Sequence, residues 1–341
     1  MDLAGLNKVA NAMTQPGKGI LAADESGGTI KKRFDAIGVE STEDNRRDYR
    51  ELLFRSKAAM HHRISGVILF DETIRQKAAD GTPLVKLIEA AGSIPGIKVD
   101  KGAKPLPFCP GETITEGLDG LRDRLIEYRD LGAKFCKWRA VIHIGDGIPS
   151  HDAINSNAHA LARYAALCQE QDLVPIVEPE VLMDGDHTIE RCEAVTTWTL
   201  KTVFQELYHA KVQLEGMVLK PNMTLPGTDC ATQASDQEIA ERTIRVLKEC
   251  VPSAVPGIAF LSGGQSDVEA TARLDAMNRI GGFPWHLTFS YGRALQHAPQ
   301  VAWAGKKDNV AAAEAAFAHR AEMNGLATLG EWTPEIEKKA A

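Results

Sequence analysis

One lysine stands at the end of an apolar stretch that has the pattern of a buried strand: Lys220 follows Gly216–Leu219, and Pro221 stops the stretch. Burying a charged ammonium without partners is costly, so such a lysine either turns to solvent or loses its proton. A neutral amine in a dry pocket is a nucleophile towards carbonyl carbons. Exposure to solvent is the ordinary alternative for Lys220 taken alone, and the other charged residues decide between the two.

Charged residues end several other apolar stretches, and they occur in pairs spaced two apart. The pairs are Lys98 and Asp100, Lys137 and Arg139, and Glu178 and Glu180, while Asp24 ends a stretch by itself. Side chains at i and i+2 lie on one face of a strand, so these groups would point into one mouth. A salt bridge between two strands explains any single pair. The whole set favours a functional site, because a barrel can close with apolar side chains and does not need so many buried charges for its stability.

Three glycine-containing loops add candidate anion sites. Two follow the last two apolar stretches, with Ser262 and Gly263 in one and Ser290, Gly292 and Arg293 in the other. A third, residues 25–29, holds Ser26 and Thr29 and is followed by Arg33. Exposed backbone N–H groups in such loops bind phosphate, although each loop alone is equally a helix-entry turn. Together with the excess of cations in the mouth, they predict an anionic substrate with a phosphate at each end.

These residue types are sufficient for a retro-aldol step without a metal or an organic cofactor. The pKa of Lys220 would have to fall from about 10.4 to roughly 7–8, and a second cation such as Lys137 provides that bias. Glu178 could move protons while an imine forms, and Asp24 could remove a hydroxyl proton to start cleavage. The histidines share no metal-binding face, and Gly-x-Gly-x-x-Gly is missing, so neither a metal nor a nicotinamide cofactor is expected.

The elements that position these residues alternate along the chain. Eight short apolar stretches predict strands, each followed by an amphipathic helical pattern: residues 18–24, 66–70, 96–100, 133–139, 174–180, 216–220, 257–263 and 286–292. Thr113, Ser235 and Ser266 each precede a glutamate by three residues, which predicts helix starts. We therefore predict an α/β fold, a single (β/α)8 TIM barrel over residues 1–341, with extra N-terminal and C-terminal helices. Residues from about 330 to 341 are expected to form a loose tail.

Composition excludes several classes of protein. A net charge of −7 and a pI near 5.8 do not indicate a protein that binds nucleic acid. No apolar run is long enough to cross a membrane. The six cysteines are scattered without Cys-x-x-Cys, and the first residues do not have the pattern of a signal peptide. These features predict a cytoplasmic protein with reduced thiols.

The motifs closely resemble those of class I fructose-1,6-bisphosphate aldolases over nearly the whole chain. The resemblance is carried by residues 17–26, 66–70, 96–102, 137–139, 176–180, 219–223, 261–266 and 288–293. It implies reversible cleavage of fructose 1,6-bisphosphate to dihydroxyacetone phosphate and glyceraldehyde 3-phosphate, in glycolysis and gluconeogenesis. It also implies a cytoplasmic homotetramer that needs no cofactor.

The resemblance further implies a role for individual residues. Lys220 would form a Schiff base with the ketone carbon, and Asp24 would deprotonate the C4 hydroxyl. Glu178, with Glu180 beside it, would exchange protons during imine formation, and Lys137 would lower the pKa of Lys220. Substrate hydroxyls and phosphates would be held by Lys98, Arg139, Ser26, Ser262, Gly263, Gly292 and Arg293.

Two positions depart from the family pattern. Thr29 stands where many relatives have serine, and its hydroxyl is expected to serve equally well. Animal relatives end in a tyrosine that assists enamine protonation, whereas the last tyrosine here is Tyr291. Alternatives are another Schiff-base aldolase or transaldolase for sugar phosphates, or a binding or scaffold role in addition to catalysis.

Overall fold

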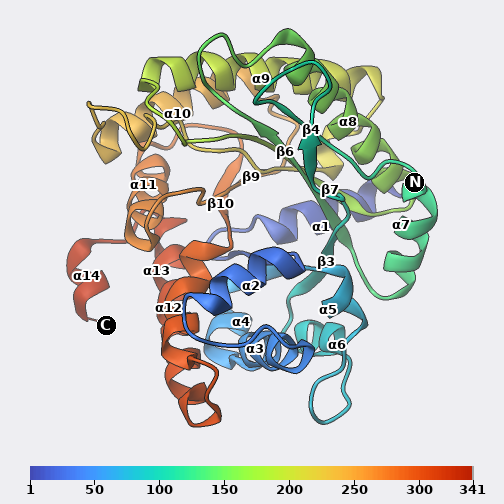
Figure 1. Cartoon of the computed structure of the whole chain (residues 1–341), viewed down its shortest axis with the longest axis vertical. Coiled ribbons are helices and arrows are strands. Elements are labelled where there is room, and N and C mark those ends of the chain that lie inside the picture. The colour runs from blue at the N-terminus through green and yellow to red at the C-terminus, as the bar shows by residue number, and fades with distance from the viewer. Residues whose placement is uncertain (340–341) are drawn as a thin grey trace.

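The computed structural model describes residues 1–339, and its central element is a closed barrel of eight parallel strands (Figure 1). The strands follow the order β1, β10, β9, β8, β7, β6, β3, β2 around the barrel. Their bounds are β1 Gly19–Ala23, β2 Ile64–Leu69, β3 Ile94–Lys98, β6 Phe135–Ile142, β7 Val174–Val181, β8 Val218–Leu219, β9 Gly257–Phe260 and β10 His286–Tyr291. Each lies within or overlaps one of the predicted stretches, so the (β/α)8 prediction is confirmed.

Helices form the outer layer and cover the barrel. Those of the N-terminal part are α1 Leu3–Met13, α2 Gly27–Asp35, α3 Glu43–Arg55, α4 Lys57–Arg63, α5 Asp71–Arg75, α6 Leu84–Ala90 and α7 Leu121–Asp130. The others are α8 His151–Glu170, α9 Ile189–His209, α10 Asp236–Cys250, α11 Asp267–Ile280, α12 Arg293–Trp303, α13 Val310–Ala327 and α14 Pro334–Lys339, with short 3-10 turns at Leu214–Gly216 and Lys307–Asn309. Within residues 1–339 none of these helices has the length and apolar character that crossing a bilayer requires.

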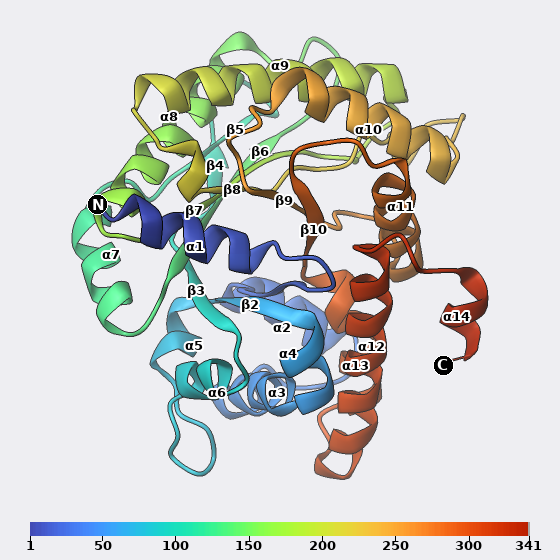
Figure 2. The same ribbon diagram turned by 180° about the vertical axis from the view of Figure 1, so that it is seen from behind.

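The barrel interior is apolar at the end where the strands begin. Ile20, Ile68, Ile176 and Val218 form one apolar cluster with Phe135, and all five are fully buried. Helix α1 packs across this end and adds Leu6, Ala10 and Met13 to the same cluster (Figure 2). The apolar floor leaves the carboxyl end of the barrel as the place where polar side chains can gather.

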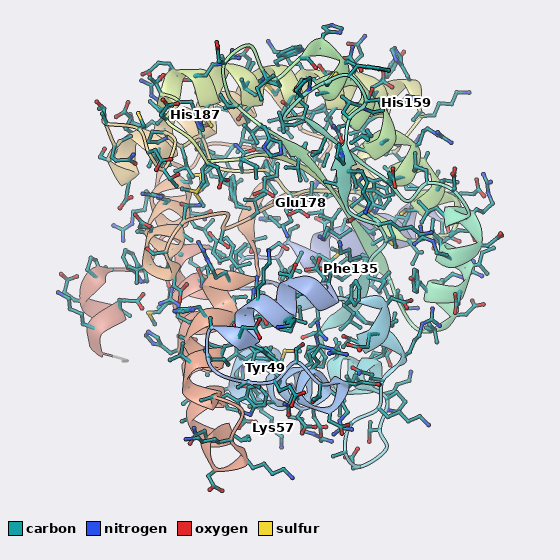
Figure 3. The ribbon with its side chains drawn as sticks, in the orientation of Figure 1. Tyr49, Lys57, Phe135, His159, Glu178 and His187 are labelled. Carbon is teal, nitrogen blue, oxygen red and sulfur yellow. The ribbon has the colours of Figure 1, made fainter. Side chains whose placement is uncertain are left out.

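Phe135 fits because two neighbouring strands carry glycine beside it. A side chain on Gly96 would begin 2.3 Å from the ring, and one on Gly66 would begin 3.1 Å from it. Such separations are shorter than van der Waals contact, so neither position accepts a larger residue while the ring stays in place. Phe135 and Glu178 both lie near the centre of the molecule in Figure 3.

Two of the three predicted helix starts are confirmed. The hydroxyls of Ser235 and Ser266 accept hydrogen bonds from the backbone N–H groups of Glu238 and Glu269, and Ser266 forms a full capping box. The prediction at Thr113 is wrong, because residues 113–115 form β5, which pairs with β4 (Ala103–Pro105) in a hairpin. The β-branched run Thr-Ile-Thr suits a strand, and Thr115 donates its hydroxyl proton to the Arg139 carbonyl at 2.7 Å.

The expectation of a loose tail is wrong for residues 334–339, which form α14. Glu337 in this helix is an ion-pair partner of the buried Arg320, and it accepts a hydrogen bond from Trp332 Nε1 at 2.8 Å. An acidic side chain that compensates a buried arginine anchors the segment, because losing it would leave that charge unpaired. Residues 340–341 of the predicted tail lie outside the described part of the chain.

Candidate active site

A cavity of about 250 Å³ opens at the carboxyl ends of the strands. The candidate residues from the sequence line it, with the exception of Asp100: Asp24, Ser26, Thr29, Arg33, Lys98, Lys137, Arg139, Glu178, Glu180, Lys220, Ser262, Gly263, Ser290, Gly292 and Arg293. Register explains part of this convergence, since Lys98 is opposite Lys137 and Arg139 is opposite Glu178 on paired strands. Alternation along each strand then turns these side chains inward. Glu25, Ala22 and Leu261 complete the lining.

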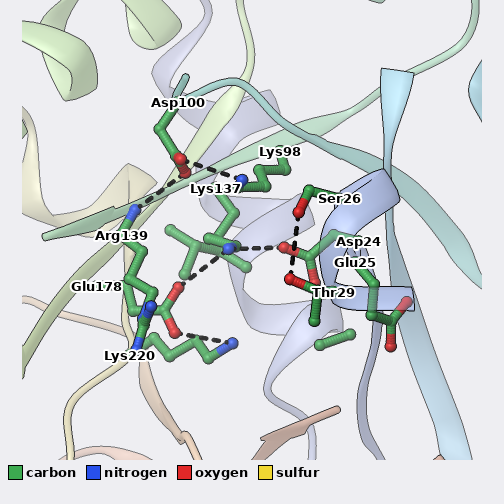
Figure 4. Close-up of polar contacts among 12 residues, drawn as sticks. Asp24, Glu25, Ser26, Thr29, Lys98, Asp100, Lys137, Arg139, Glu178 and Lys220 are labelled. Atoms are coloured by element: carbon green, nitrogen blue, oxygen red, sulfur yellow. Dashed lines mark hydrogen bonds and ion pairs between the residues drawn. The ribbon is translucent and has the colours of Figure 1, made fainter. Parts of the chain in front are cut away.

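Four charged groups form a continuous chain across the cavity floor (Figure 4). Lys220 Nζ lies 3.1 Å from Glu178 Oε1, and the second oxygen of Glu178 lies 3.4 Å from Lys137 Nζ. Lys137 Nζ also contacts Asp24 Oδ2 at 2.6 Å. Lys137, Glu178 and Lys220 are each at least 95% buried, so the groups satisfy one another instead of water. The solvent-facing alternative for Lys220 is thereby excluded.

The same proximity shifts the pKa values of three of these groups. Burial raises the pKa of Asp24, but Lys137, Lys220 and Lys98 outweigh it and lower the pKa to about 2. Burial also raises the pKa of Glu178. The cations Lys137, Lys220 and Arg139 outweigh burial and hold this pKa below its ordinary value. Burial lowers the pKa of Lys137, but the neighbouring Asp24 and Glu178 outweigh burial and raise this pKa above its ordinary value. Both carboxylates are therefore ionised and Lys137 is an ammonium ion near neutral pH.

A second ionic group lies beside the first. Arg139 pairs with Glu180, and Lys98 Nζ lies 3.2 Å from Asp100 Oδ1. Asp100 also accepts hydrogen bonds from the backbone N–H groups of Arg139 and Gly102 at 3.3 and 3.1 Å. Asp100 was expected to point into the mouth with the others, but it stands behind Lys98 and holds it in place instead.

The predicted phosphate loop at residues 25–29 leads into the start of α2. Ser26 is the N-cap residue, but within residues 1–339 its hydroxyl pairs with that of Thr29, 3.1 Å away, instead of capping a backbone N–H. The first N–H groups of α2 therefore remain available to an anion, which the helix dipole also favours. Arg33, one turn further along, forms an ion pair with Glu25.

The other two loops follow β9 and β10 and line the same cavity as α2. Gly263 has φ = +55°, a left-handed conformation that favours glycine, and this turns the loop after β9 towards the site. Arg293 at the start of α12 donates to the carbonyl oxygens of Gly263 and Gln265 at 3.2 and 3.0 Å. Arg293 therefore connects the two glycine-containing loops at the mouth of the cavity.

The lowered pKa of Asp24 gives a test of the electrostatics that does not depend on activity. A carboxyl whose pKa falls from 3.8 unfolded to about 2 folded stabilises the protein fully above pH 3.8. That stabilisation is lost as the pH falls through about 2. Between pH 6 and pH 3 we expect wild type to lose about 1 kcal/mol more unfolding free energy than Asp24→Asn. Urea unfolding at the two pH values measures this, and equal losses would contradict the assignment.

Comparison with known proteins gives one consistent result. Residues 5–341 match the family described as fructose-bisphosphate aldolase class-I. A protein of Xanthomonas campestris pv. campestris, described as a probable fructose-bisphosphate aldolase class 1, is 57% identical over 335 residues, which is 97% of this chain and 99% of that protein. Cytosolic fructose-bisphosphate aldolase 4 of Arabidopsis thaliana is 54% identical over 96% of this chain and 84% of its own length.

A solved structure agrees. The Plasmodium falciparum fructose-bisphosphate aldolase, solved as a ternary complex with TRAP and a small-molecule inhibitor, superposes with a TM-score of 0.95 at 49% identity. The match covers 97% of this chain and 96% of that one. A parallel barrel with a buried lysine beside a carboxylate and cationic loops at its mouth suits a lyase that acts on sugar phosphates. The chain belongs to the class I fructose-bisphosphate aldolase family.

Proposed function

We propose that Lys220 is the amine through which this aldolase cleaves fructose 1,6-bisphosphate into dihydroxyacetone phosphate and glyceraldehyde 3-phosphate. The observation that carries the proposal is the position of Lys220 Nζ, buried and 3.1 Å from Glu178 Oε1, on the floor of a cavity lined by three loops that are predicted to bind phosphate. Attack of the neutral amine on the C2 carbonyl forms a carbinolamine. Loss of water then leaves a protonated imine.

Glu178 is suited to move protons in this step, because its carboxylate is the group in contact with the amine. It takes a proton from the Lys220 nitrogen as the carbinolamine forms and gives one to the hydroxyl that departs as water. Lys137 keeps Glu178 ionised and in place between the two lysines. Glu180 acts behind it by holding Arg139 at the cavity wall.

Asp24 is the proposed base for carbon–carbon cleavage. It removes the proton of the C4 hydroxyl, the C3–C4 bond breaks, and the electron pair moves to the iminium nitrogen to give an enamine. The aldehyde product leaves, the enamine carbon is protonated, and water hydrolyses the resulting imine. A pKa of about 2 keeps Asp24 ionised at any working pH, with Lys137 beside it to stabilise the charge that moves.

The loops at the cavity mouth are proposed to hold the two phosphates of the substrate. Ser26, Thr29 and Arg33 on the α2 side are proposed to hold one phosphate, and Ser262, Gly263, Gly292 and Arg293 the other. Lys98, Arg139 and Ser290 line the same cavity and are proposed to contact the sugar hydroxyls. An aldolase that prefers a singly phosphorylated sugar is the alternative, and turnover of fructose 1-phosphate against the bisphosphate separates the two.

Location and assembly are proposed by analogy with relatives. The Arabidopsis proteins are named as cytosolic, which supports a cytoplasmic location for this chain. A homotetramer is the state expected from the family, and sedimentation equilibrium of the purified chain measures it.

Borohydride trapping tests the proposed chemistry. Reduction in the presence of dihydroxyacetone phosphate should add the mass of the reduced adduct to one peptide containing Lys220, with loss of activity. Reduction without substrate is the control and should add no mass. Activity should persist in EDTA. Adduct on another lysine, or activity lost to EDTA and restored by a divalent metal, would refute the proposal.

A further inference from the structure

A buried arginine lies beneath the phosphate loop of α2 but does not line the cavity. Arg50, on α3, is only 1% exposed. Its Nη2 donates to the Glu25 backbone carbonyl at 3.1 Å and lies 3.7 Å from Glu25 Oε2. Its Nη1 lies 3.6 Å from Glu72 Oε2. The mechanism above makes no use of Arg50, yet burying a guanidinium so fully is costly unless it compensates a charge.

The charge that Arg50 faces belongs to Glu25, which directly follows the proposed base Asp24. Glu25 is buried, and three side chains from different elements hold it. Gln296 on α12 donates to Glu25 Oε1 at 2.7 Å, Arg33 on α2 pairs with the same oxygen, and Arg50 approaches the other. Glu25 is therefore a fixed anion at the back of the phosphate loop.

Arg33 is shared between this anion and the cavity. Its Nη1 is the atom bound to Glu25, and within residues 1–339 its Nη2 makes no hydrogen bond. That Nη2 lies 3.5 Å from the point where a side chain on Gly292 would begin, on the open side of the site. A phosphate bound there would compete with Glu25 for the charge of Arg33. How strongly Arg33 can interact with a phosphate therefore depends on whether another cation compensates the charge of Glu25.

We propose that Arg50 is a positioning residue for phosphate binding: it neutralises Glu25 from behind, so that Arg33 can bind a substrate phosphate without leaving Glu25 uncompensated. The proposal rests on the phosphate-binding role proposed for Arg33. Removing Arg50 would leave Arg33 as the one cation paired with Glu25 among residues 1–339, and it would remove a positive charge near the anion site. Both effects act in the same direction and weaken phosphate binding.

Burial lowers the pKa of Arg50, and Glu25 and Glu72 oppose that shift. Because an arginine starts from so high a pKa, Arg50 stays charged in the folded protein. Its contribution is therefore permanent, unlike that of a residue that titrates near neutral pH.

The test is calorimetric titration of inorganic phosphate into the full-length protein, which requires no catalysis. Arg50→Met should raise the dissociation constant about tenfold, the loss of roughly one charge-assisted contact. Arg50→Lys, which keeps the charge, should stay within about threefold of wild type. The double variant Arg50→Met/Glu25→Gln should recover to within about threefold, because the anion that needed compensation is gone.

Arg46→Met is the matched control. Arg46 lies one turn before Arg50 on α3, pairs with Glu72, and touches neither Glu25 nor the cavity. This variant should lose thermal stability but keep the wild-type phosphate affinity. A purely structural role for Arg50 predicts the same result for Arg50→Met, and that result would overturn the proposal. So would a double variant that binds phosphate no better than Arg50→Met.

If Arg50→Met does not fold, Arg50→Lys and the charge-neutral double variant decide the question. The proposal requires both to stay within about threefold of wild type, and a tenfold loss of phosphate affinity in either would overturn it. Failure of the proposed catalytic function is recognised separately. In that case borohydride would not trap substrate on Lys220 even in the wild-type protein.

Discussion

Replacement of Lys220 by methionine is expected to reduce kcat for cleavage of fructose 1,6-bisphosphate by at least about 10⁴-fold, since the amine that forms the imine is then missing from its position in the cavity. Methionine has nearly the length of lysine and fills the same buried space, so the barrel should remain folded. Glu178 keeps its contact with Lys137 in this variant, 3.4 Å away. A coupled assay of triose phosphate release measures the loss.

Lys134→Met is a suitable control, since Lys134 is an exposed lysine immediately before β6 and lies outside the cavity. It should retain wild-type turnover. A Lys220→Met protein that folds and still cleaves the bisphosphate at the wild-type rate would show that the reaction does not proceed through this amine.

Lys137→Met is expected to have the second largest effect, a fall in kcat of about 10²- to 10⁴-fold. Lys137 contacts both Asp24 and Glu178 and lowers the pKa of each, so removing it leaves two buried carboxylates with less compensation. Both pKa values should rise. Activity should then be lost at a higher pH on the acidic side than in wild type, which a profile of kcat/KM against pH measures.

The sign of that shift makes the prediction specific. A depressed carboxyl pKa that returns towards its ordinary value moves the acidic limb upwards and never downwards. Trapping of dihydroxyacetone phosphate on Lys220 serves as the control for an intact site. An unchanged profile in a folded Lys137→Met protein would mean that Lys137 is not the cation that controls these two groups.

The barrel and its mouth could be predicted because both follow from local patterns. Short apolar stretches separated by helical patterns specify parallel strands, and charges spaced two apart at their ends specify one shared mouth. Lys137 with Arg139, and Glu178 with Glu180, converge for this reason. The N-caps at Ser235 and Ser266 are equally local, since each involves residues three apart.

The parts that the sequence did not reveal depend on contacts between distant residues. Alternation turns Glu25 away from Asp24, and nothing near it in the chain indicates that Arg50 and Gln296 will meet it. The prediction of a helix start at Thr113 is wrong because its spacing to Glu116 imitates a capping box. In the folded chain its hydroxyl donates to a carbonyl of β6, which is a contact between distant residues. Glu337 was assigned to a loose tail because its partner Arg320 lies on a separate helix.

The floor of the barrel has an evolutionary consequence. The ring of Phe135 occupies the volume that side chains at positions 66 and 96 would need. A substitution at any one of the three positions therefore constrains the other two, and their histories should be coupled. Among homologues, a larger residue at 96 should accompany a smaller one at 135, so that covariation of this triplet records how the lumen was filled. The charged residues above it can diverge independently of that choice.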